Sequence, residues 1–206
     1  MPLVFTSKDI ASTHCMALRL FQELYYMAHY KNLASILEHG ILSHTLVNKA
    51  NVEHVDISLA GAQQWRTGLE PVFFHSIHDY VPLYFNPRNP MLYSRREQQR
   101  NLVILCISTE VLSSGTKILF TDGNAACKST QFSTSTDVVQ PAVPVLEAPS
   151  WNQFSEGRRM RCAETLVLHH VPHKFIEKVV CNNTLLALRL KNQHDINVTI
   201  DPSFFF

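Results

Sequence analysis

Residues 77–93, with the sequence IHDYVPLYFNPRNPMLY, constrain the fold of this chain more than any other segment. They carry five aromatic or histidine side chains and three prolines, at positions 82, 87 and 90. Each proline fixes the backbone φ angle and removes an N–H donor, so the pattern predicts an irregular segment that is neither helix nor strand. Rigid apolar surface on such a segment favours the wall of a binding pocket. The alternative is a proline-rich connection that simply packs on the core.

Length and composition narrow the class of protein. The chain has 206 residues and a formal net charge of +1. We expect a single domain over residues 1–206, in which residues 1–24 form a helical N-terminal extension of unknown role. The five cysteines are widely spaced without a CxxC pair, which argues against a disulfide framework and fits the reducing cytosol. No apolar run reaches transmembrane length, so we expect a cytoplasmic protein without membrane contact.

The hydrophobic pattern predicts an α+β domain built around a mixed sheet. Residues 122–157 are rich in Ser, Thr, Asn and Pro, which predicts a long functional or mobile loop, and residues 43–65 give no clear signal. Helices are expected at residues 7–24, at 33–39 between an Asn32 cap and Gly40, and from an Asn183 cap to Lys191. Extended segments are expected at residues 25–29, 101–108, 116–121, 164–171, 178–181 and 196–200.

Common cofactor and metal motifs are absent from the sequence. None of the six glycines forms GxGxxG or GxxxxGK, so a Rossmann or P-loop phosphate site is not expected. HExxH and GxSxG do not occur either. His169, His170 and His173 form an HHxxH run next to Pro172. We interpret them as ordinary histidines at the end of a strand and expect no metal.

A single carboxylate stands out in residues 158–167, RRMRCAETLV. Strand alternation places Glu164 on the same face as Leu166 and Leu168. A carboxylate among apolar side chains is costly unless it has donors or a chemical task. Spacing leaves two interpretations open. Glu164 either pairs at the surface with Arg158 or Arg161, or faces a pocket in which positive charge develops.

Four motifs occur in an order that resembles the DarT family, the DNA ADP-ribosyltransferase toxins of DarTG toxin–antitoxin systems. They are YYMAHYKNLASILEHGI at residues 25–41, HDYVPLYFNPRNPML at 78–92, FTD at 120–122 and RCAETLV at 161–167. The resemblance covers roughly residues 25–183. It implies an ADP-ribosyltransferase fold, in which a split, bent mixed sheet holds NAD⁺ in a cleft. It also implies a monomer that modifies a base in single-stranded DNA without a metal, with a DarG-like macrodomain antitoxin as partner.

The same resemblance assigns site residues. Glu164 matches the catalytic glutamate, which would stabilise an oxocarbenium-like ribosyl cation and accept a proton from the attacking base. Arg66 is assigned more loosely as the second catalytic residue, because residues 43–75 carry little identity with the family. The NAD⁺ contacts would be His29, Asn32, Arg66 and Tyr84. Base stacking and phosphate contacts would come from His78, Tyr80, Asn86, Arg88, Asn89, Met91, Arg95, Arg158 and Arg161.

The sequence departs from the family pattern in a segment that bears on the choice of target base. NPRNPM, at residues 86–91, differs from the PRSPM or PFSPM endings of the thymine-modifying members. The amides of Asn86 and Asn89 could read a base edge, which favours guanine, with thymine as the alternative. Two other functions stay open: the same cleft acting on RNA or protein, and an inactive module that binds single-stranded nucleic acid. Retention of Glu164 argues against the inactive module.

Overall fold

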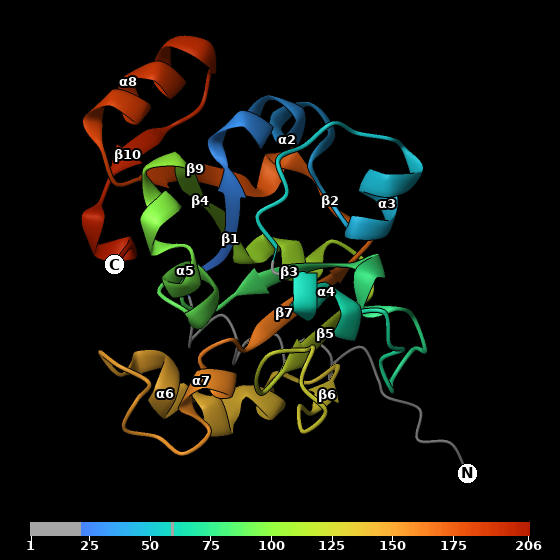
Figure 1. The fold of residues 1–206 in the computed structure, drawn as a ribbon. Coiled ribbons are helices and arrows are strands. Elements are labelled where there is room, and N and C mark those ends of the chain that lie inside the picture. Colours follow the sequence, from blue (N-terminus) through green and yellow to red (C-terminus); the bar gives the residue numbers. More distant parts are fainter. Residues whose placement is uncertain (1–21, 59) are drawn as a thin grey trace.

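A computed structural model describes residues 22–58 and 60–206 (Figure 1). In this part of the chain an eight-stranded sheet has the order β10-β9-β4-β1-β3-β7-β5-β6, and β10 and β9 are its parallel pair. A two-stranded sheet pairs β2 with β8. The strands are β1 Glu23–His29, β2 Ile41–Leu42, β3 Tyr80–Tyr84, β4 Leu102–Ser108, β5 Ile118–Thr121, β6 Phe132–Ser133, β7 Glu164–Leu168, β8 His170–Val171, β9 Ile176–Cys181 and β10 Val198–Ile200.

Short helices lie around this sheet. In Figure 1, α2, α3 and α8 lie towards one end of the molecule, and α6 and α7 lie at the opposite end. Helix α2 ends at Gly40, whose φ of 78° and close approach to the Val171 carbonyl exclude a Cβ. The α-helices are α2 Leu33–His39, α3 His44–Lys49, α4 Ala60–Trp65, α5 Pro90–Ser94, α6 Val143–Glu147, α7 Gly157–Met160 and α8 Thr184–Gln193.

The sheet is split between β1 and β3. These strands pair at a single position, Tyr25 opposite Tyr84, whereas β1 pairs with β4 along its whole length, from Glu23 to His29. Pro82 lies in β3 opposite Leu166 of β7 and has no N–H to offer β1. The sheet therefore divides into two halves, β10-β9-β4-β1 and β3-β7-β5-β6. This confirms the split mixed sheet expected from the resemblance.

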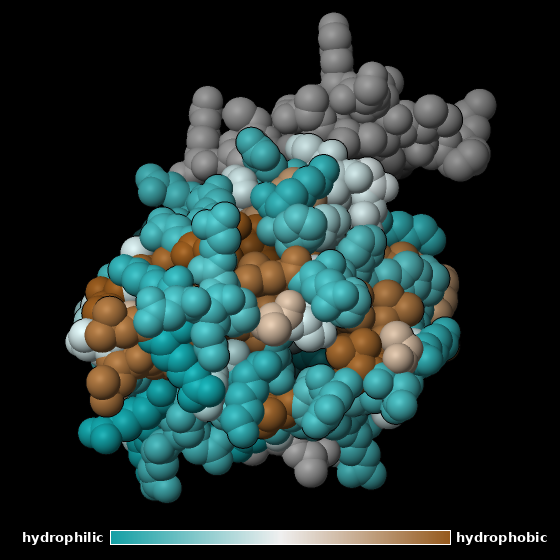
Figure 2. All heavy atoms as spheres, turned by 90° about the horizontal axis from the view of Figure 1, so that it is seen from above, coloured by the Kyte–Doolittle hydropathy of each residue, from teal (hydrophilic) through white to brown (hydrophobic). Residues whose placement is uncertain are grey.

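Strand β4 could be recognised from the sequence because both of its faces are buried in the core. Val103, Leu105 and Ile107 of β4 belong to one buried cluster, whereas the alternate residues of the same strand belong to a second cluster on the other face. A strand that is buried on both faces has a continuous apolar run, which is the pattern NLVILCIS. Figure 2 shows that, on the face seen from above, apolar residues form several patches separated by hydrophilic ones.

Most predicted elements are confirmed, including all six extended segments and the helix capped by Asn183, whose Oδ1 accepts from the Leu186 N–H. The prediction that residues 77–93 are neither helix nor strand is wrong, because they contain β3 and α5. Pro82 is tolerated where the sheet splits, and Pro90 occupies the first turn of α5. The helix predicted at residues 7–24 is also wrong at its end, where β1 already begins; residues 7–21 lie outside the described part.

Residues 122–157 are less irregular than predicted. They contain β6, a 3₁₀ helix over Thr136–Ala142, and α6. Within the described ranges, no helix is long and apolar enough to cross a membrane.

Candidate active site

Glu164 and Arg66 form a buried ion pair at the split of the sheet. Glu164 is the first residue of β7 and is 1% exposed. The Arg66 guanidinium donates from Nη2 to Oε2 at 3.1 Å and from Nη1 to Oε1 at 3.3 Å. The structure therefore brings together two residues, 98 positions apart, that the sequence assigned to one site. The surface pairing of Glu164 with Arg158 or Arg161 is not found.

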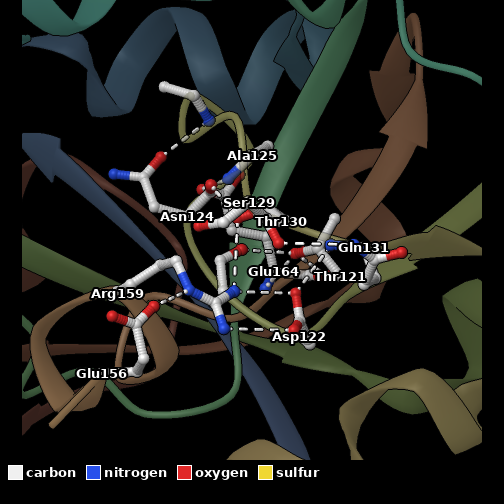
Figure 3. Close-up of polar contacts among 12 residues, drawn as sticks. Thr121, Asp122, Asn124, Ala125, Ser129, Thr130, Gln131, Glu156, Arg159 and Glu164 are labelled. Carbon is white, nitrogen blue, oxygen red and sulfur yellow. Dashed lines mark hydrogen bonds and ion pairs between the residues drawn. The ribbon is translucent and has the colours of Figure 1, made fainter.

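The end of β5 and the 122–131 loop that follows it hold Glu164 in place (Figure 3). The Thr121 hydroxyl accepts from the Glu164 N–H at 2.9 Å and donates to the Gly123 carbonyl at 2.7 Å. The Ala125 N–H donates to Glu164 Oε1 at 3.3 Å. The carboxylate thus has both a guanidinium and a backbone amide as donors, which fixes its orientation.

Ionisation around the pair follows from burial and charge. Burial lowers the pKa of Arg66, but the Glu164 carboxylate outweighs this effect and raises the pKa above its ordinary value. Burial, and then Glu164, raise the pKa of Tyr84 well above its usual range. Burial, and then Glu164, raise the pKa of Cys162 to about 12. The Glu164–Arg66 pair therefore lies beside a neutral phenol and a neutral thiol.

A cleft of about 410 Å³ opens beside this pair, and an adjoining compartment of about 150 Å³ extends from it. The cleft is lined by three arginines, Arg66, Arg158 and Arg159, whereas the smaller compartment is lined by polar side chains that include Asn32, His44 and Asp56. Both spaces share a wall formed by Ser58, Gln63, Pro82, Tyr84 and Met91. Tyr84, Met91 and Arg158, which the resemblance assigned to NAD⁺ or DNA contacts, all line the cleft.

Arg159 connects the 122–131 loop to α7, directly before β7 (Figure 3). Its guanidinium donates to Asp122 Oδ1 at 2.8 Å and Oδ2 at 3.2 Å, and to Glu156 Oε2 at 2.8 Å. Its side chain also packs on Gly123, where a Cβ would overlap it. No pattern in the sequence predicts this clamp. The FTD motif contains Asp122, but its partner lies 37 positions later.

His78 lies beside the smaller compartment, where its imidazole packs at a tilt against that of His44. Its ring centroid is 4.4 Å from that of His44, and its Nε2 lies 2.7 Å from Gln63 Oε1. Burial, then His44 and Arg66, lower the pKa of His78. His78 therefore supports Gln63 of the shared wall; the structure does not place it among the residues lining either space.

His29 and Asn32 stand at the far side of the smaller compartment. His29 ends β1, and its Nδ1 accepts from the Lys31 N–H at 3.3 Å; the ring does not line either space. Asn32 does line the smaller compartment. Its amide does not cap α2, because it bonds twice to the Val55 backbone, at 2.8 and 3.0 Å. Asn32 thus holds the 52–57 segment over this compartment.

Three residues expected to contact DNA bases have structural roles instead. Tyr80 is 2% exposed, and its hydroxyl donates to the buried Glu70 at 3.0 Å. Asn89 is 1% exposed and caps α5 by accepting from the Leu92 N–H. Asn86 donates to the Leu146 carbonyl and accepts from the Arg88 N–H. Asn–Pro segments need such local caps, so these amides serve the backbone.

Three arginines expected to meet phosphates are also placed differently. Arg161 is 3% exposed and donates to the carbonyls of Arg88, Val145, Leu146 and Ala148. Arg95 donates to the carbonyls of Ile57 and Ser58. The Arg88 guanidinium carbon lies 4.7 Å from the centroid of the Phe206 ring, away from the cleft lining. Helix ends and irregular segments leave carbonyls without partners, and guanidinium groups fill that need.

The HHxxH run has no metal-site partner in the structure. Over residues 22–58 and 60–206, no group of three His, Cys, Asp or Glu side chains could hold a metal ion. Glu70 is a buried carboxylate that sequence reasoning missed. It accepts from the N–H groups of Val72, Phe73 and His75 and shapes the turn that precedes β3.

The sequence of the chain is similar to one protein family and to several curated proteins. The family model DarT, described as ssDNA thymidine ADP-ribosyltransferase, matches residues 25–206. A DNA ADP-ribosyl transferase–DNA ADP-ribosyl glycohydrolase fusion protein of Thermosipho africanus is 32% identical over 197 residues, covering 90% of this chain and 50% of the relative. The chain thus spans about half the length of that relative. A DNA ADP-ribosyl transferase of Thermus sp. is 28% identical, with 76% of this chain and 79% of the relative covered.

Solved structures agree with the fold. Thermosipho africanus DarTG in complex with ADP-ribose superposes with a TM-score of 0.82 at 30% identity, covering 90% of this chain and 51% of that one. Thermus sp. 2.9 DarT in complex with ADP-ribosylated ssDNA gives a TM-score of 0.79 at 24% identity, covering 90% of this chain and 96% of that one. The split sheet is therefore the architecture found in these proteins.

Proposed function

The chain belongs to the DarT family, and we propose that it transfers ADP-ribose from NAD⁺ to a base in single-stranded DNA. The observation that supports this most is the buried Glu164–Arg66 pair beside a cleft of about 410 Å³. A buried carboxylate paired with an arginine that lines the cavity suits a reaction in which positive charge develops on a bound ribose. Arg158, an exposed arginine of the cleft lining, suits the diphosphate of NAD⁺.

NAD⁺ supplies a ribose whose C1′–nicotinamide bond breaks as a bond from C1′ to a base nitrogen forms. We assign Glu164 to the face of that ribose, where its carboxylate stabilises the charge of the transition state and accepts the proton that the base nitrogen loses. Arg66 holds the carboxylate in place. Tyr84, Met91 and Asn32, which line the two spaces, are the remaining side chains that we assign to cofactor or base contacts, and Arg158 is the phosphate contact. His29 lines neither space, so its assignment to NAD⁺ rests on the resemblance alone.

Thymine is the base that we propose as acceptor. Guanine was favoured because the amides of Asn86 and Asn89 could read a base edge. Both amides instead bond to the chain's own backbone. The family description names thymidine. In a DNA strand thymine has one ring N–H, at N3, so that proton is the one Glu164 would accept.

Oligonucleotides that each lack one base test this proposal. Each is incubated with the protein and NAD⁺ carrying a label in the adenylate part, and labelled DNA is counted. We expect labelling of every oligonucleotide except those without thymine. Loss of label only without guanine would restore the guanine assignment. Labelling of RNA or protein but of no DNA would contradict the proposed substrate.

We further propose that the modification is toxic and is reversed by a DarG-like macrodomain partner. The fusion of a transferase to a DNA ADP-ribosyl glycohydrolase in the Thermosipho africanus relative supports such a pairing. Expression of the chain in a bacterial host should stop growth, and co-expression of a macrodomain glycohydrolase should restore it. Growth arrest that persists in Glu164→Gln would contradict a toxicity caused by transfer.

A further inference from the structure

Trp65 is an exposed aromatic side chain next to the active-site arginine. It is the last residue of α4 and is 58% exposed, although Arg66, the next residue, reaches the buried Glu164. An exposed indole beside the Glu164–Arg66 pair offers an aromatic face on which a nucleotide base can stack.

A cation from a different element lies over this ring. The Lys128 ammonium is 5.6 Å from the centroid of the Trp65 indole, and Lys128 itself is exposed. It lies in the 122–131 loop, next to Cys127 and Ala126, which line the cleft. The ring and the cation thus come from the two segments that also supply Arg66 and the Ala125 amide to Glu164.

This combination is the chemistry that binds unpaired nucleotides. Aromatic faces hold bases by stacking without reading their sequence, and lysine neutralises the neighbouring phosphate. A bound NAD⁺ would meet Arg158 inside the cleft, whereas neither Trp65 nor Lys128 is among the residues that line it. The position outside the cleft suits a nucleotide adjacent to the one that enters it.

We propose that Trp65 and Lys128 form a stacking site for the nucleotide that flanks the target base. The indole would stack on that base, and the Lys128 ammonium would move from the ring to the adjoining phosphate. The inference rests on the proposed transfer to single-stranded DNA. It adds a subsite that holds the strand while the target base lies in the cleft, which lowers the KM for DNA and leaves NAD⁺ binding unchanged.

Steady-state kinetics with a mixed-sequence oligodeoxynucleotide of about 12 nucleotides test the site. We expect Trp65→Ala to raise the KM for the oligonucleotide about 10-fold, equal to ~1.4 kcal/mol, and Trp65→Phe to restore most of it. Lys128→Gln should weaken binding and reduce its dependence on salt. The Kd for NAD⁺ should not change in any of these variants. Leu185→Ala and Lys191→Gln, exposed on α8, are the matched controls.

Fluorescence provides a second, direct measurement. The chain has two tryptophans, so a Trp151→Phe variant reports Trp65 alone. Its emission should be quenched when the oligonucleotide is added. DNA modification with an unchanged KM in Trp65→Ala, or no quenching on binding, would overturn the stacking site but not the proposed function. If the wild-type protein neither binds nor modifies any oligonucleotide, both proposals fail.

Discussion

Arg161 illustrates how a cation beside a candidate nucleic-acid site can serve the protein backbone. Its guanidinium donates to carbonyls at the C-terminal end of α6 and to that of Arg88, and the side chain is 3% exposed. We expect Arg161→Lys to lower the free energy of unfolding by about 2 kcal/mol, because lysine cannot reach carbonyls in several directions at once. Urea unfolding measures this change. The exposed Arg158→Lys is the control, and equal stability of both variants would contradict this role.

The buried Glu70 should make the stability of the protein depend on pH. Burial raises the pKa of Glu70, but hydrogen bonds from Phe73, His75, Val72 and Tyr80 outweigh it and lower the pKa below 4.5. A lowered pKa adds stability that is present above pH 4.5 and is lost as the pH falls through the lowered value. Glu70→Gln should therefore be less stable at pH 7 by about 1–3 kcal/mol. The difference from wild type should shrink in acid; a gap independent of pH would refute this explanation.

The clamp between the 122–131 loop and α7 belongs to the scale of elements. Asp122 accepts two hydrogen bonds from Arg159, and the loop it anchors donates the Ala125 N–H to Glu164. We expect Asp122→Asn to lower kcat about 10-fold, because the Glu164 carboxylate loses its fixed orientation when the loop is released. The Kd for NAD⁺ should change little. Glu156→Gln, which changes the more exposed partner of Arg159, should have a smaller effect. Equal kcat in Asp122→Asn and wild type would show that the loop needs no clamp.

The elements also explain what sequence reasoning could find. Strand β4 was recognisable because both of its faces are buried, and α8 because Asn183 caps it locally. Strand β3 was missed, since Pro82 is tolerated only where β1 and β3 separate, and no local pattern reveals that separation. Which strands pair along their whole length depends on the assembled sheet, so it cannot be read from the residues of β3 alone.

At the scale of the whole molecule, the two central residues of the site could be predicted from the sequence. The side chains that hold the backbone around them could not. The resemblance supplied Glu164 and Arg66, and the fold brings them together. The roles of Arg95, Arg161 and Asn89 depend on carbonyls and amides in segments whose course the sequence does not reveal. Side chains that hold an irregular backbone have the same composition as side chains that bind nucleic acid, so composition alone could not separate them.

The central claim is that Glu164 carries out ADP-ribosyl transfer to single-stranded DNA, and mass spectrometry of the oligonucleotide tests it most directly. The wild-type protein and Glu164→Gln are each incubated with NAD⁺ and a thymine-containing single strand, with the exposed Glu110→Gln as control. We expect wild type and Glu110→Gln to add one ADP-ribose per modified base and to release nicotinamide. Glu164→Gln should be slower by about 100-fold or more while it remains folded. An unmodified strand with wild type, or full modification by Glu164→Gln, would contradict the claim.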